Sequence, residues 1–261
     1  MSPDNKRMEP NVSVLDAHSA ADDSCQPELD ADAELFDGRE MVMVHQVIRR
    51  EFGLLPGAVA SIAPDEQGGD RAGMIARHID WLVKFLHEHH STEDHALWPL
   101  LVQRCGQELL TARMQSEHEE LATGLDTVVQ ALEVWNDDRT AASRDALEHA
   151  LREIITPLNA HLSDEEQHAV PLLERYVGAQ EVRRAVEAGL AQFTPDEVTL
   201  VIGMLMYEGD PEMIDRVLEA MPPDIGAALR VAGPSEFARH SEQVHGTPTP
   251  PRSTELADSR R

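Results

Sequence analysis

The segment Leu86–Leu101, LHEHHSTEDHALWPLL, returns 72 residues later as Leu158–Leu173, LNAHLSDEEQHAVPLL. Both copies contain His-x-Ser-x-Glu followed, after five further residues, by Pro-Leu-Leu. The matching pairs are His89 with Glu93 and His161 with Glu165. Residues at i and i+4 of a helix share one face, with Cβ atoms about 5–6 Å apart. Each copy therefore places an imidazole and a carboxylate close enough to act together.

A lone histidine precedes each copy at a similar distance. His45 lies 44 residues before His89, and His118 lies 43 residues before His161. The chain thus has two similar halves, each with one histidine and one His-x-x-x-Glu pair. Four imidazoles and two carboxylates related by an approximate twofold are what a pair of metal ions needs. We predict a two-metal site formed by His45, His89, Glu93, His118, His161 and Glu165.

Around these positions the large apolar residues recur at alternating intervals of three and four, which is the period of an amphipathic helix. Four long segments show this period, at about 41–62, 82–100, 110–132 and 147–172. All six proposed ligands lie on the apolar stripes, where a carboxylate is rare unless it is paired or bound to a cation. We predict an all-α fold, an antiparallel up-down four-helix bundle with an additional C-terminal extension of short helices.

The end of the first helix is open to two interpretations. Gly53 and Pro56 favour an end near Phe52, because proline lacks a backbone donor and clashes with the preceding turn. The depth of the ligands favours a longer, kinked helix to about Ala63. His45 then lies 18 residues before the end of its helix, and His89 lies 18 residues after the start of the next helix, so the two can meet across antiparallel helices. We predict the longer helix, with Ser143 available to cap the fourth.

Composition divides the chain into four predicted parts: an acidic disordered segment at 1–37, the bundle at 38–177, a helical extension at 178–245 and a disordered tail at 246–261. In the extension, Thr194-Pro195-Asp196-Glu197 has the hydroxyl cap, proline and glutamate that open a helix. Further helices are expected to begin near Pro211 and near Ser235.

The net charge of −26 disfavours nucleic acid and anionic membranes as partners. We find neither the apolar core of a secretory signal nor a stretch long enough to span a bilayer, so a cytoplasmic location is expected. Cys25 and Cys105 are too few for a disulfide framework and are expected to be free thiols. The protein is expected to be a monomer or a homodimer.

Two competing ligand patterns were weighed. His90 with Asp94 has the same spacing as His89 with Glu93, but the apolar stripe selects the latter pair and the second copy has no equivalent. His87, His90 and His95 are then predicted to be solvated or to lie just outside the site. Glu165-x-x-His168 resembles the Glu-x-x-His of ferritin-like bundles, but the position that matches His168 is Ala96.

Carboxylates with imidazoles and no thiolate suit Fe, Mn or Zn. In two-metal sites the ions lie about 3.5–4 Å apart, and carboxylates from facing helices can bridge them. The ligand set alone does not choose among these metals.

The motif set resembles the hemerythrin-like family, also called HHE cation-binding domains, over about Glu40 to Tyr176. The resemblance rests on a histidine in the first helix, His-x-x-x-Glu with Leu-Trp-Pro in the second, Glu-His-Glu-Glu-Leu in the third and His-x-x-x-Glu-Glu in the fourth. It implies two iron ions, oxo- or hydroxo-bridged, with His45, His89, His118 and His161 as terminal ligands and Glu93 and Glu165 as the carboxylates. Mn and Zn stay open.

The chain departs from the oxygen-carrying hemerythrins at one position. Those proteins have a second histidine one turn after the third-helix ligand, where this chain has Ala122 after His118. A terminal ligand is therefore missing or supplied from elsewhere. The resemblance then favours family members associated with peroxide, nitric oxide or oxygen sensing and with iron handling.

Two functions follow from this resemblance and from the ligand set. The first is a di-iron oxidoreductase that binds or consumes hydrogen peroxide, nitric oxide or dioxygen. The alternative is a non-enzymatic oxygen or iron sensor, or an iron-handling protein, since a core with unpaired polar ligands is less stable when empty. A bundle without metal that serves as an interaction protein would leave Glu93 and Glu165 buried without partners.

Overall fold

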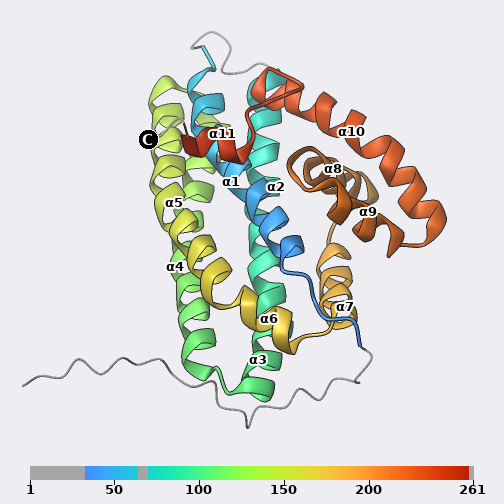
Figure 1. The fold of residues 1–261 in the computed structure, drawn as a ribbon. Coiled ribbons are helices and arrows are strands. Elements are labelled where there is room, and N and C mark those ends of the chain that lie inside the picture. The colour runs from blue at the N-terminus through green and yellow to red at the C-terminus, as the bar shows by residue number, and fades with distance from the viewer. Residues whose placement is uncertain (1–32, 64–69, 259–261) are drawn as a thin grey trace, which may run out of the picture.

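The computed structural model describes residues 33–63 and 70–258, and all the regular elements in these ranges are helical. Figure 1 shows their arrangement. In chain order they are α1 (Arg39–Ala60), α2 (Asp70–Thr92), the π-helical turn η2 (Glu93–Leu97), α3 (Trp98–Cys105), α4 (Glu108–Asp138), α5 (Ala141–His168), α6 (Val170–Tyr176), α7 (Ala179–Leu190), α8 (Pro195–Glu208), α9 (Pro211–Glu219), α10 (Pro223–His245) and α11 (Ser253–Asp258). The prediction of an all-α protein is confirmed.

The four longest segments of the first two thirds of the chain pack around one core. Helix α5 packs against both α1 and α4, and α2 packs against both α1 and α4, so the four surround a common interior (Figure 1). We call α1, α2, α4 and α5 the core helices. Their apolar stripes supply side chains that are fully buried between them, such as Leu55, Leu82, Val128 and Leu151.

Helix α1 continues through Gly53 and Pro56 and ends at Ala60. Matching depth was thus a better guide than local propensity, and the helix stops three residues before the predicted end. The packing explains this outcome, because Phe52, Leu55 and Val59 are each at most 1% exposed and their burial offsets the proline. The turn predicted after Ala63 lies mainly outside the described residues.

The connection between α4 and α5 needs only two residues. Arg139 adopts a left-handed conformation, with φ of 48°, and ends α4. Thr140, rather than the predicted Ser143, is the N-cap of α5. The Thr140 hydroxyl accepts from the Ser143 backbone N–H, and the Ser143 hydroxyl accepts from the Thr140 N–H, which forms a reciprocal capping box.

Both copies of the repeated segment break at the same point, one turn after the glutamate. In the first copy α2 widens into the π-helical turn η2, where the Trp98 N–H reaches back five residues to the Glu93 carbonyl. In the second copy α5 ends at His168, and α6 restarts at Val170. Each break precedes a proline, Pro99 or Pro171, which cannot donate a backbone hydrogen bond to the preceding turn.

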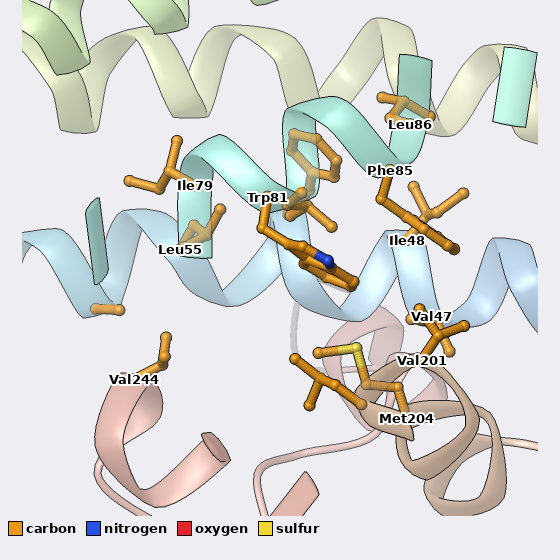
Figure 2. Packing of buried hydrophobic residues seen from close by; sticks show 14 of the residues in the cluster. Val47, Ile48, Leu55, Ile79, Trp81, Phe85, Leu86, Val201, Met204 and Val244 are labelled. Atoms are coloured by element: carbon orange, nitrogen blue, oxygen red, sulfur yellow. The ribbon is translucent and has the colours of Figure 1, made fainter. Parts of the chain in front are cut away.

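The C-terminal extension lies against α1 and α2. Helix α8 packs against α1 and α10, and α10 packs against α2 (Figure 1). Figure 2 shows Val201 and Met204 of α8 and Val244 of α10 beside the apolar side chains of α1 and α2. Helices α8 and α9 begin at Pro195 and Pro211 as predicted. The predicted start near Ser235 is wrong, because α10 begins at Pro223 and accommodates Pro234 within it.

The ends of the described chain differ from the composition-based expectation. Residues 1–32 of the acidic segment lie outside the described residues, but Phe36 is buried and its N–H donates to the Val177 carbonyl. The stretch from 246, expected to be a disordered tail, crosses back over the core helices and forms α11 against α1. The backbone N–H of Ser253 donates to Glu208, which holds this stretch in place.

Across the described residues, helices with the length and apolar character needed to span a bilayer are lacking.

Candidate metal centre

The six predicted ligands meet in the interior of the core helices. His45 comes from α1, His89 from α2, Glu93 from η2 and His118 from α4, while His161 and Glu165 come from α5. All are buried except His89, whose side chain is only 10% exposed. Because the six residues lie at the same depth along helices that run in different directions, residues up to 120 positions apart in the chain meet.

The two carboxylates lie between the histidines. One oxygen of Glu93 is 3.0 Å from His89 Nε2 and the other is 3.5 Å from His118 Nε2. An oxygen of Glu165 is 3.4 Å from His45 Nε2 and 3.7 Å from His161 Nε2. Each carboxylate thus faces one histidine from each half of the chain. This is the placement that bridging ligands between two cations require.

Most of the atoms that point into this cluster have no hydrogen-bond partner among the protein atoms. They are His45 Nε2, His89 Nε2 and both carboxylate oxygens of Glu93 and of Glu165. A buried polar group without a partner costs roughly 1–3 kcal/mol, and a charged one costs more. So many unpaired donors and acceptors converging at one point fit a cluster of cations and do not fit an apolar core.

Carboxylates outside the cluster hold the imidazole rings in place. His45 Nδ1 is 2.9 Å from Glu166, His118 Nδ1 is 2.9 Å from Asp94, and His161 Nδ1 is 2.9 Å from Glu117. A carboxylate on Nδ1 fixes the tautomer that leaves Nε2 free to bind a metal ion. The sequence analysis did not assign these roles, although each carboxylate directly precedes or follows a predicted ligand in the chain.

The family model described as the hemerythrin HHE cation binding domain matches residues 38–186. The chain belongs to this family. Comparison with curated proteins and with solved structures gives no match. The matched range covers all four core helices and the cluster between them, so the HHE domain and the structural cluster coincide.

His90 is buried in this HHE domain, which excludes the solvated position and leaves the predicted position just outside the site or a place within it. It is 6% exposed, and its ring stacks on His118 with a centroid distance of 4.0 Å and an interplanar angle of 8°. Its Nε2 is buried without a hydrogen-bond partner, and one of its ring nitrogens lies within 4.8 Å of ring nitrogens of His118 and His161. His90 is buried although it lies beside the apolar stripe of α2, because α2 is covered on two sides, by α1 and by α4.

His90 places a further imidazole beside His118, on a helix other than the one that contains Ala122. The Ala122 side chain is exposed although it follows His118 by one turn, so a histidine there would point to solvent. The nitrogens of His90, His118 and His161 form one group, and His45, His89, Glu93 and Glu165 form the other. The HHE domain thus has three imidazoles on one side of the carboxylates and two on the other. His87 and His95, by contrast, are exposed as predicted.

Burial raises the pKa values of the carboxyl groups in the cluster and lowers that of His161, so it favours the neutral form of each group. Desolvation, with the neighbouring charge of Glu165, raises the pKa of Glu93 well above its usual range, and desolvation also raises the pKa of Glu165. Desolvation, with His118 and His45 nearby, lowers the pKa of His161 to about 3. Neutral imidazoles are the form that binds metal, and cations between the two carboxylates would offset the desolvation that raises their pKa values.

Proposed function

We propose that this HHE domain holds two iron ions between the core helices. One ion would be held by His45 and His89, the other by His90, His118 and His161, with Glu93 and Glu165 between them. The packing of α1, α2, α4 and α5 supports the antiparallel four-helix bundle expected for this family. The observation that carries the proposal is the convergence of buried ligand atoms without protein partners.

We further propose that the site binds or reacts with a small oxidant, which is hydrogen peroxide, nitric oxide or dioxygen. Iron would supply coordination positions for such a ligand and electrons for its reduction. The chain contributes the rigid placement of the imidazoles through Glu166, Asp94 and Glu117. It also keeps bulk water away, since the ligand side chains are at most 10% exposed.

The lining of a cavity beside the cluster supports the proposal of an uncharged ligand. It has a volume of about 170 Å³ and is lined by His89 and Glu93 together with apolar side chains of α1, α2, α7, α8 and α9. Among the apolar residues are Met43, Phe85, Val201 and Leu205. Apolar surfaces favour solutes that bind water weakly, so nitric oxide and dioxygen fit this cavity better than hydrogen peroxide.

Metal analysis joined to spectroscopy tests this proposal. Purified protein should contain about two iron ions per chain and absorb in the near-ultraviolet and visible range, as bridged diferric centres do and zinc does not. His90→Ala should remove part of the iron, whereas His87→Ala on the exposed face of the same helix should leave the content unchanged. Metal-free protein that folds as well as the purified protein would exclude the di-iron proposal.

A sensor or iron-handling protein is the second candidate. Helix α7 packs against η2, which contains Glu93, and the extension lines the same cavity as His89. A change in metal occupancy at Glu93 could therefore reach the extension through direct contact. Assays of peroxide and nitric oxide consumption separate the two candidates, because a sensor would change conformation with iron or oxygen without turnover at a useful rate.

A further inference from the structure

A second buried cluster of histidine and glutamate lies outside the metal centre. Glu51 of α1, His78 of α2 and His245 at the end of α10 direct their side chains to one point. The side chains of Glu51 and His78 are fully buried, and that of His245 is 4% exposed. Glu51 lies six residues after His45, which is about 9 Å along α1, so the two clusters are separate.

The two imidazoles share one carboxylate oxygen. His78 Nε2 is 2.9 Å and His245 Nε2 is 3.0 Å from Glu51 Oε2. The other oxygen, Oε1, accepts from Arg50 at 2.7 Å, so Oε2 is left to the histidines. In a tetrahedral zinc site with bonds of about 2.0–2.1 Å, neighbouring donors lie about 3.3 Å apart. Each histidine–carboxylate distance would have to lengthen by only a few tenths of an ångström to match this spacing, and all three ligand atoms already lie within 4.8 Å of one another.

The charge of the surroundings favours a cation. Arg50 is buried and pairs with both Glu51 and Glu208, so one guanidinium faces two carboxylates. Although burial alone would raise it, the pKa of Glu51 is lowered well below its usual range by Arg50 and the two histidines. Burial lowers the pKa of His78, which keeps its ring neutral. An ionised carboxylate beside a neutral imidazole is the state that a metal ion binds.

His240 orients the central histidine of this cluster. Its Nε2 lies 3.0 Å from His78 Nδ1, and His240 itself precedes His245 by five residues on α10. A hydrogen-bond partner on the second ring nitrogen holds a metal-binding imidazole in one tautomer and one orientation. The His78 ring also stacks on Trp81, with a centroid distance of 5.7 Å. The ring is thus fixed on both sides before any ion binds.

We propose that Glu51, His78 and His245 bind one divalent cation of the zinc class, in addition to the ions of the metal centre. Two borderline imidazoles beside one hard carboxylate favour zinc over magnesium or calcium, and the three ligands leave a fourth position for water. The ion joins α1 and α2 to the last residue of α10, about 170–190 positions away in the chain. It therefore fastens the C-terminal extension to the core helices.

The test is zinc stoichiometry in full-length protein, measured by elemental analysis after dialysis with zinc and by titration against a chromophoric chelator. His245→Gln should bind one equivalent of zinc fewer than the wild type, because the Gln amide can still donate to Glu51 but does not replace the imidazole as a ligand. His78→Gln should show the same loss. Glu242→Gln, on the exposed face of the same helix, should bind as much zinc as the wild type.

The metal centre provides an independent reference. Glu165→Ala should lose ions from the metal centre and keep the equivalent that His245→Gln loses, so failure of one site is distinguishable from failure of the other. Equal zinc content in the wild type and in His245→Gln would overturn the proposal and assign the cluster to hydrogen bonding alone. The chelator titration of the wild type decides the matter even where a variant folds poorly, since it counts the sites directly.

Discussion

Two buried clusters of histidine and glutamate both take side chains from α1 and α2, and they differ in how their polar atoms are satisfied. In the metal centre, the carboxylate oxygens of Glu93 and of Glu165 make no hydrogen bond to the protein, although each carboxylate lies 3.0–3.7 Å from two histidines. In the second cluster, both oxygens of Glu51 accept hydrogen bonds, one from Arg50 and one from two histidines. The first cluster is therefore expected to lose more stability than the second when no cation is bound, because the second forms a hydrogen-bonded network.

The largest expected effect is the loss of the metal centre. Glu165→Ala should lower iron content and melting temperature together. A ligand whose free concentration is about 1,000 times its Kd stabilises the folded state by about 4 kcal/mol, and the variant loses this contribution. Elemental analysis and thermal unfolding measure both quantities. Gln167→Ala, exposed on the same helix, is the control and should change neither. Unchanged iron in Glu165→Ala would show that the cluster is not the metal site.

Substitution of the second carboxylate should have the next largest effect. Glu51→Gln leaves buried Arg50 with Glu208 alone and should reduce the free energy of unfolding by about 3–5 kcal/mol, the range for breaking a buried ion pair. The lowered pKa of Glu51 means that its contribution is present at neutral pH and lost as the pH falls through the folded-state pKa. Denaturant unfolding should therefore show that the difference in free energy of unfolding between the wild type and Glu51→Gln is smaller at acidic pH than at neutral pH.

A Glu→Gln substitution in the metal centre should raise the free energy of unfolding when metal is absent, whereas Glu51→Gln lowers it. The raised pKa of Glu93 means that chelated protein loses stability as the pH rises through the folded-state pKa. Glu93→Gln cannot ionise, so at about pH 8 the chelated variant should melt higher than the chelated wild type, by about 2–4 °C for each kcal/mol gained. A lower melting temperature for chelated Glu93→Gln would contradict the contrast between the clusters.

The smallest expected effect concerns the carboxylates that orient the histidines. Glu117→Gln keeps the size of the side chain but weakens its hold on His161 Nδ1, and should reduce metal affinity about 10–100-fold. Chelator competition measures this change, with Glu119→Gln on the exposed face of α4 as the matched control. Equal affinities in the two variants would show that the imidazole is held by packing alone.

The pattern of the sequence was enough to predict the helical class, the four core segments and the six residues that meet in the buried cluster. The reason is periodicity: the repeat at 72 residues and the apolar stripes fix both the face and the depth of His89, Glu93, His161 and Glu165. Apolar period also outweighed the local signal of Pro56 in α1. These properties are encoded within single helices and need no knowledge of their neighbours.

Contacts between helices, in contrast, became visible only in the folded structure. His90 is buried because α1 and α4 both cover α2, a fact that one helical stripe does not contain. His245 meets Glu51 because α10 packs on α2, and α11 is ordered because Glu208 binds the backbone of Ser253. Such contacts join residues distant in the chain, and their partners are chosen by packing and charge rather than by local period.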